Sequence, residues 1–193
     1  MEMTQGMIDK YGQENMKALA EYKAKYLPQG TETKLPNEPK DIPVGTILTQ
    51  YWLNSVTYYM VTRTTKKGVE FVEILDTQVE FDHDGGGTGT RYCMPDFVKT
   101  FEVQKTYKDF VERTGLDIFN MKTWTREEFD KLSKEDQDLY FNLSDCKGCS
   151  KKILKITKPA KYGGFCIPGV HEGFMCGSMR LWDGTPDHEY YGD

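Results

Sequence analysis

The residues of this chain whose spacing best suits chemistry are cysteines. Segment 146–149 reads Cys-Lys-Gly-Cys, a C-x-x-C knuckle, and a short turn with glycine can direct two thiolates at one tetrahedral zinc ion. Cys146 and Cys149 would supply one half of the ligands, and Cys166 and Cys176 the other half. An ordinary zinc ribbon has a second C-x-x-C knuckle at that place. The sequence therefore predicts a candidate structural zinc site with half of its usual pattern, and no other cofactor.

A second interpretation treats all five cysteines as free thiols. Their number is odd, and the N-terminus lacks the apolar segment of a secretory signal, which argues against a disulfide framework. The redox interpretation of C-x-x-C needs a cysteine at the N-terminus of a helix, whereas this knuckle precedes a segment of strand character. Free thiols are therefore the favoured interpretation, with zinc as the alternative.

Two histidines have acidic neighbours. His83 and His188 each lie between two acidic residues, an arrangement that could suit acid–base chemistry. Adjacent residues on a strand point to opposite faces, however, so these carboxylates do not by themselves orient the imidazoles. The sequence contains no G-x-S-x-G and no H-E-x-x-H motif. We therefore expect a protein that is not an enzyme.

A glycine-rich segment is the next candidate for a ligand site. Residues 85–89 read Gly-Gly-Gly-Thr-Gly. Consecutive glycines expose backbone amides that can hold a phosphate, but a phosphate-binding loop continues with a lysine, and none follows within this segment. The segment therefore predicts the flexible loop of a hairpin.

Aromatic and basic side chains in segment 51–67 form the candidate binding residues. These are Tyr51, Trp52, Tyr59, Arg63, Lys66 and Lys67. Tyr, Trp and Arg dominate the hot spots of protein interfaces, and aromatic rings beside basic groups also stack on the bases of single-stranded nucleic acids. The net charge of −5 argues against a dedicated nucleic-acid surface. A protein partner is therefore the first interpretation, and single-stranded nucleic acid is the alternative.

The same part of the chain has the composition of a β-sheet. β-branched and aromatic residues are concentrated in residues 43–75, and they suit a pleated, half-buried surface. Strands are predicted over residues 44–52, 56–64 and 69–75, with turns at 54–55 and 65–68. Because side chains alternate, the odd-numbered residues from Thr57 to Arg63 would share one face. Both faces carry aromatic residues, so the sheet is either covered on both sides or presents one face to a partner.

A pattern spread over this segment and the C-terminus resembles a known family. It comprises residues 45–47, Trp52, residues 54–61 and 67–69, and the tail Leu-Trp-Asp-Gly-Thr-Pro at 181–186. The pattern is similar to that of small β-rich proteins carried by bacteriophages and mobile elements, mostly of Gram-positive bacteria. The matching residues cover under half of the chain, and the resemblance implies a β-domain and a phage setting but no active site. The chain departs from it by a helical N-terminal extension and an insertion at residues 105–150.

Further elements are predicted outside this sheet. Residues 4–26 carry an amphipathic helical pattern that should pack on the core, and residues 31–42 have the composition of a linker. Strand character returns at residues 90–103, with an interruption at 94–96, and again at 153–156, 162–167 and 174–182. Three short helices are predicted over residues 107–113, 126–132 and 134–142. The last two have capping boxes that begin at Thr125 and Ser133.

These elements predict an α+β fold with a small twisted antiparallel β-sheet or a barrel-like core. An N-terminal helix (residues 1–30) and a linker (31–42) precede a β-domain formed by residues 43–104 and 151–193, and residues 105–150 form a helical insertion. Trp182, at the end of a strand before an Asp-Gly turn, is predicted to anchor the C-terminal tail in the core.

The composition predicts a soluble protein of the host-cell cytoplasm. The mean hydropathy is −0.64, and no apolar run approaches the about 20 residues of a membrane span. Residues 145–161 carry six lysines and one acid, whereas residues 163–193 carry five acids and one arginine. Because the resemblance implies a phage setting, and because no apolar run is long enough to span a membrane, we expect a phage-type accessory protein that binds a host protein or a protein–nucleic-acid complex, without a membrane partner. Inhibitors of host defence, such as those of the anti-CRISPR kind, and host-takeover factors act in this way.

Overall fold

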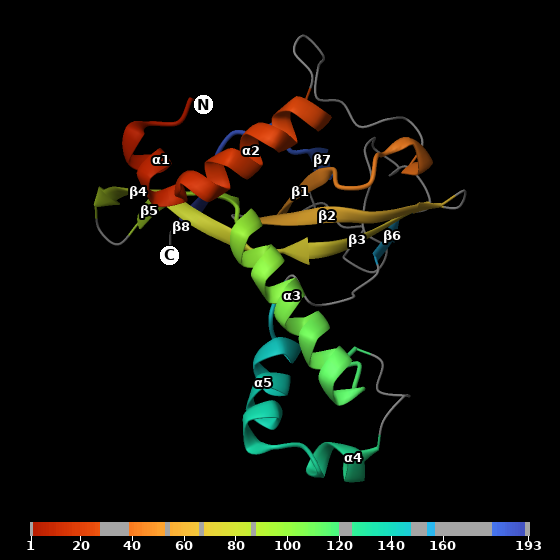
Figure 1. The fold of residues 1–193 in the computed structure, drawn as a ribbon. Coiled ribbons are helices and arrows are strands. Elements are labelled where there is room, and N and C mark those ends of the chain that lie inside the picture. Colours follow the sequence, from red (N-terminus) through yellow and green to blue (C-terminus); the bar gives the residue numbers. More distant parts are fainter. Residues whose placement is uncertain are drawn as a thin grey trace.

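The computed structural model describes residues 2–27, 39–52, 55–65, 68–85, 88–119, 125–147, 154–156 and 179–191. Figure 1 shows two helices beside two antiparallel sheets, and a long helix that leads away to two shorter helices. The fold is therefore α+β, as predicted, and among the described residues the strands do not close into a barrel. None of the helices in this part of the chain is both long and apolar enough to cross a membrane.

The first sheet contains the predicted hairpin strands. Its order is β6-β3-β2-β1-β7, with all neighbours antiparallel. The strands are β1 (Ile47–Trp52), β2 (Ser55–Thr65), β3 (Gly68–Ile74), β6 (Leu154–Ile156) and β7 (Arg180–Leu181). The first three confirm the strands predicted from composition, and β6 and β7 fall inside two of the segments with strand character. The predicted segment 162–167 lies outside the described residues.

A β-bulge in β2 changes which side chains share a face. Val61 pairs with Phe71, but the next pair joins Arg63 to Glu70, so Thr62 is an extra residue on β2. An extra residue reverses the alternation beyond it. Arg63 therefore lies on the face opposite to Val61, and the prediction that the two share a face is wrong.

Both faces of this sheet are buried. On one face Tyr58 is 1% exposed and packs in a cluster with residues of the N-terminal helices. On the other face Tyr59 is 8% exposed, and its ring lies 5.2 Å from that of Phe71 in a second cluster. Of the two arrangements that the sequence allowed, the structure has the sheet covered on both sides.

The second sheet has the order β4-β5-β8, again antiparallel. Its strands are β4 (Asp76–Gly85), β5 (Thr88–Pro95) and β8 (Asp187–Tyr191). Only Leu75 separates β3 from β4, so the chain passes directly from the first sheet into the second. Gly85 pairs with Thr88, which confirms that the glycine-rich segment lies at the tip of a hairpin. Strand β8 was not predicted.

The N-terminal segment forms two helices rather than one. These are α1 (Gln5–Tyr11) and α2 (Gln13–Tyr26), and they meet at Gly12, whose φ of 82° and ψ of 151° interrupt the helix. The predicted packing on the core is confirmed, because Met7 and Leu19 are buried with residues of both sheets. The Tyr22 ring lies 5.3 Å from that of Trp182.

The C-terminal tryptophan is a core residue, as predicted. Trp182 is 1% exposed, and its indole N–H donates a hydrogen bond to the Thr185 carbonyl at 2.8 Å. Its ring also meets that of Tyr58 edge-on at 6.1 Å. The tail is therefore fixed between the first sheet and α2.

The long helix α3 (Phe97–Thr114) begins earlier than the sequence predicts. Strand character was predicted as far as residue 103, but Asp96 caps a helix, because its side chain accepts a hydrogen bond from the Lys99 amide at 3.0 Å. The predicted boundary between β-domain and insertion at residues 104–105 thus falls inside one continuous helix.

Helix α3 carries a separate lobe with α4 (Arg126–Asp130) and α5 (Lys134–Ser144), as Figure 1 shows. Thr125 and Glu128 form the predicted capping box of α4, and Ser133 caps α5 by accepting from the Asp136 amide at 3.1 Å. The lobe has its own buried cluster. Its members are Phe110, Leu116, Ile118, Phe129, Tyr140 and Leu143.

Little of the predicted linker is described. Residues 39–41 form a short 3-10 helix (Pro39–Asp41), and the next residue, Ile42, is 1% exposed in the second cluster. The end of this segment is thus part of the core, and residues 31–38 lie outside the described residues.

Gly12 gives a test of the junction between α1 and α2. An added Cβ would meet no atom within 4 Å, so Gly12→Ala should lose stability only through its backbone, which occupies a region open almost solely to glycine. We expect a loss of about 1–3 kcal/mol in the free energy of unfolding. The control is Gly6→Ala in α1, which should raise stability by up to about 1 kcal/mol. Urea unfolding measures both, and equal effects would contradict the account.

Candidate functional site

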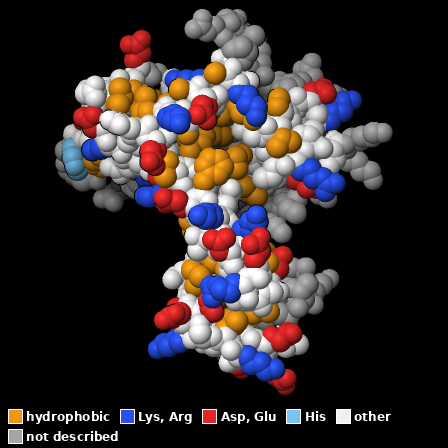
Figure 2. Space-filling model, in the orientation of Figure 1, with side chains coloured by type: hydrophobic (Ala, Val, Ile, Leu, Met, Phe, Trp, Pro, Cys, Tyr) orange, Lys and Arg blue, Asp and Glu red, His pale blue; other side chains and the backbone are white. Residues whose placement is uncertain are grey.

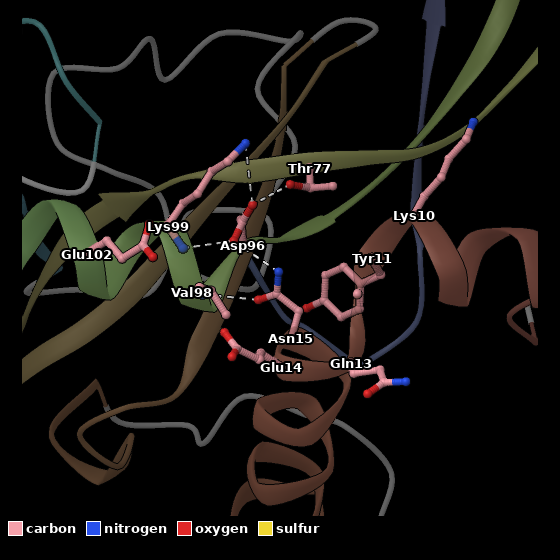
Figure 3. A pocket seen from close by; sticks show the side chains of 11 residues that line it. Lys10, Tyr11, Gln13, Glu14, Asn15, Thr77, Asp96, Val98, Lys99 and Glu102 are labelled. Carbon is pink, nitrogen blue, oxygen red and sulfur yellow. Dashed lines mark hydrogen bonds and ion pairs between the residues drawn. The ribbon is translucent and has the colours of Figure 1, made fainter.

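The described residues contain a groove between the α1–α2 junction and the start of α3. Its volume is about 430 Å³, and Figure 3 shows the side chains that line it. They come from α1, α2, β4 and α3, and include Lys10, Glu14, Thr77, Lys99 and Glu102. With Asp96, which also lines the groove, the lining carries two lysines and three acidic residues, a balance too even to select a charged ligand.

The floor of this groove is a hydrogen-bonded joint centred on Asp96, which is 3% exposed. The Asp96 carboxylate accepts hydrogen bonds from the Asn15 amide at 3.1 Å and from the Thr77 hydroxyl. Burial raises the pKa of Asp96, but these bonds and the Lys99 amide outweigh it, so the pKa lies below its usual value. The groove is therefore lined by groups that connect elements of the fold.

Asn15 completes the joint. Its side-chain oxygen accepts from the Val98 amide at 3.1 Å, which satisfies a second free amide of the α3 N-terminus. The Tyr11 hydroxyl donates to the Pro95 carbonyl at 2.6 Å. The start of α3 is thus already capped from within the protein, and its role is to hold the N-terminal helices, β5 and α3 together.

A second cluster of titratable groups lies where the two sheets meet. Glu189 of β8 is 6% exposed. Its carboxylate accepts from the Val56 amide of β2 at 2.8 Å, and lies 3.6 Å from an Arg91 guanidinium nitrogen. The buried Cys93 thiol points at it from 3.8 Å. A side chain of the second sheet therefore binds the backbone of the first.

Asp187, two residues before Glu189, points to the same side of β8 and accepts a hydrogen bond from the Tyr51 hydroxyl of β1. Burial raises the pKa of Asp187, and the Tyr51 hydroxyl opposes that rise without cancelling it. Burial raises the pKa of Cys93 as well, and the Glu189 carboxylate adds to the effect, so the thiol stays protonated. The cluster is suited to holding β8 in place rather than to nucleophilic chemistry.

The predicted binding residues do not form one surface. Tyr51 pairs with Val56 and therefore shares a face with Tyr58, whereas Tyr59 lies on the opposite face and is buried. Arg63 is exposed at the far end of β2, 3.8 Å from Glu70. The backbone of Trp52 belongs to β1, but its side chain lies outside the described residues, as do Lys66 and Lys67.

Only one of the predicted metal ligands is described. Cys146 follows α5, is half-buried, and donates weakly to the Lys147 carbonyl at 3.2 Å. Burial raises the pKa of its thiol. Cys149, Cys166 and Cys176 lie outside the described residues, so the zinc site and the free thiols both stay predictions.

A row of stacked side chains was missed from the sequence. The Arg180 guanidinium lies 4.4 Å from the centre of the Tyr51 ring, and the His188 ring, from β8 of the second sheet, lies 6.5 Å from the Tyr51 ring and is tilted against it by 56°. Tyr190 continues the row, 5.6 Å from His188 and edge-on to it. We call Arg180, Tyr51, His188 and Tyr190 the stacked row. His188 and Tyr190 are two residues apart, a spacing that places two side chains on one face of a strand. This spacing was not used, because the strand that contains them was not predicted.

Large apolar side chains are also exposed on the helical part. Phe101 of α3 is 57% exposed and Phe141 of α5 is 56% exposed. Figure 2 shows hydrophobic side chains gathered where α2 meets α3, and others on the lobe below. The lobe thus combines a buried cluster with aromatic surface.

Known proteins resemble this chain neither in sequence nor in fold at a significant level. A scan against protein-family models, a search of curated proteins and a search of solved structures returned no match. The resemblance to phage and mobile-element proteins therefore stays a prediction.

Asp187 provides a pH-dependent test of the sheet junction. A carboxyl group whose pKa is higher in the folded state lowers stability while it is ionised, and this cost disappears as the pH falls through the folded pKa. Asp187→Asn keeps an oxygen for the Tyr51 hydroxyl and removes the charge. We expect it to raise the free energy of unfolding at pH 7 by more than the about 0.5 kcal/mol by which neutral surface substitutions scatter, with the difference from wild type shrinking at lower pH.

Chemical denaturation across the acidic range measures this difference. The control is Asp138→Asn on the exposed surface of α5, which should change stability by less than about 0.5 kcal/mol at pH 7. A loss of stability in Asp187→Asn that exceeds the control would show that the ionised carboxylate is favourable.

Proposed function

We propose that this protein is a non-enzymatic accessory protein of the bacteriophage type, and that it acts by binding a protein of its bacterial host. The buried carboxylates and thiol of the described residues make structural contacts within the fold. The binding surface lies on the helical part rather than on the central sheet.

The observation that carries this proposal is the exposure of Phe101 and Phe141. A solvent-exposed phenylalanine lacks the stabilisation that removing its ring from water would give, and a partner can supply it. Aromatic residues are accordingly enriched at protein interfaces. The two phenylalanines lie on α3 and α5, which extend from the sheets (Figure 1). A helical projection of this shape can reach a concave surface of a partner.

The central sheet is a poor alternative surface. Its aromatic residues Tyr58 and Tyr59 are buried on opposite faces, so contact with a partner would require the sheet to be uncovered. The same burial weakens the single-stranded nucleic-acid interpretation, because stacking on a base needs an exposed ring. The net charge of −5 also opposes phosphate binding.

Affinity capture from nuclease-treated host lysate tests the proposal. We expect wild type to retain a host protein, and Phe101→Gln/Phe141→Gln to lose it by more than about tenfold, since interface aromatics dominate binding energy. The matched control is Val44→Thr, which alters an apolar side chain of similar exposure (53%) away from the projection. Thermal melts of all three confirm that the fold is kept.

Equal capture by wild type and the double variant would contradict the helical surface. Capture that disappears after nuclease treatment would instead indicate nucleic acid as the partner.

A further inference from the structure

The stacked row crosses the boundary between the two sheets and is open to solvent along most of its length. Arg180 belongs to β7, Tyr51 to β1, and His188 and Tyr190 to β8. Arg180 and His188 are exposed, Tyr190 is 56% exposed, and Tyr51 is half-buried. Four planar side chains from three strands therefore form one continuous surface feature.

One end of this row already holds a guanidinium group. Arg180 lies over the Tyr51 ring at 4.4 Å, within the distance at which a cation is attracted to the face of an aromatic ring. Burial raises the pKa of the Tyr51 hydroxyl, and the hydrogen-bonded Asp187 carboxylate raises it further, so the ring stays neutral. The protein itself thus shows what kind of group this row accepts.

The other end of the row offers the same kind of ring in an exposed position. His188 and Tyr190 are two residues apart on β8 and therefore point to the same side. Their rings meet at 90°, an edge-to-face arrangement that leaves ring surface available beside the edge contact. This end is built for a planar group that comes from outside.

The charges beside this end favour a cation. Across the second sheet, His188 of β8 pairs with Tyr92 of β5, which pairs with Glu80 of β4. In the same way Tyr190 pairs with Thr90, which pairs with Asp82. Glu80 and Asp82 therefore lie on the same side of the sheet as the exposed rings. Neither of these two sets of paired residues contains a lysine or an arginine. Across β5 these carboxylates would repel a phosphate group and attract a guanidinium through space, and the guanidinium would also stack on the rings.

We propose that His188 and Tyr190 bind an arginine side chain in a basic segment of the partner protein, with Glu80 and Asp82 as carboxylates on the same face of the sheet, two strands away. This inference rests on the proposed function, which it extends by a second contact surface and the chemistry of the residue bound there. Arginine is favoured over lysine because its planar guanidinium stacks on aromatic rings, whereas an ammonium group is compact and strongly hydrated.

Peptide titration at low ionic strength tests the inference. The probes are a peptide of alternating arginine and serine, its lysine counterpart, and an oligothymidylate, each followed by isothermal titration calorimetry and, in wild type, also by shifts of the side-chain NMR signals of His188 and Tyr190. We expect the arginine peptide to bind at least about threefold more tightly than the lysine peptide, which corresponds to a modest cation–π preference. We expect His188→Ala/Tyr190→Ala to lose this preference.

The matched control is His83→Ala, which removes an exposed histidine from β4 and should leave the arginine preference intact. Thermal melts confirm that the double variant folds. Equal binding of both peptides, a preference that survives in the double variant, or tighter binding of the oligothymidylate would each overturn the inference.

The peptide titration and the host-protein capture can fail separately. If host-protein capture still depends on Phe101 and Phe141 while the arginine peptide shows no preference, the inference fails and the proposed function stands. If the peptide preference is found but no host protein is captured, the arginine site stands and the proposed host-protein binding fails.

Discussion

The C-terminal strand β8 is held across the boundary of two sheets by two inward-facing carboxylates. Glu189 accepts a hydrogen bond from the backbone of β2, and Asp187 accepts one from Tyr51 of β1. Carboxylates on an edge strand usually point to solvent, and burying a charge is costly unless it is paired. Here Arg91 and a backbone amide supply that pairing for Glu189. The arrangement of both sheets around this boundary depends on these contacts.

The surface features follow from this constraint. Because Asp187 and Glu189 point inward, His188 and Tyr190 must point outward, and Tyr51 is brought beside them. At the other side of the fold, the joint around Asp96 fixes where α3 begins and therefore where the helical lobe and its exposed phenylalanines lie. The buried carboxylates of β8 thus position the stacked row, and the joint around Asp96 positions the exposed phenylalanines of the helical part.

The sequence predicted the elements whose side chains follow a simple period. The β-branched and aromatic residues of β1, β2 and β3 alternate, and Thr125 and Ser133 precede helices with the expected caps. Strand β8 was missed because its buried positions are acidic, which reverses the usual pattern of apolar inside and polar outside. Residues 97–103 were assigned to a strand because of their apolar side chains, although the bond from the Lys99 amide to Asp96 is a local N-cap that the sequence could have indicated. The additional bond from Asn15, far away in the sequence, could not be read from it.

The candidate site, too, could be predicted only in part from the sequence. Tyr51 was recognised as a candidate, but Tyr59 was placed with it because composition does not tell which face of a sheet is covered. The neighbours that give Tyr51 its surface role, Arg180 and His188, are more than a hundred residues away in the sequence. The pairing of β1 with β7 places Arg180 beside Tyr51, and the hydrogen bond from the Tyr51 hydroxyl to Asp187 brings β8 with His188 beside it.

Hydrogen–deuterium exchange at the Val56 amide tests this account most directly. The account predicts strong protection of this amide in wild type, retained protection in Glu189→Gln, which keeps an acceptor oxygen, and loss of protection in Glu189→Leu. The amide of Phe110 in the lobe should exchange at the same rate in all three proteins. A Val56 amide that exchanges freely in wild type, or that is equally protected in Glu189→Leu, would contradict the claim that β8 is held to the first sheet by this carboxylate.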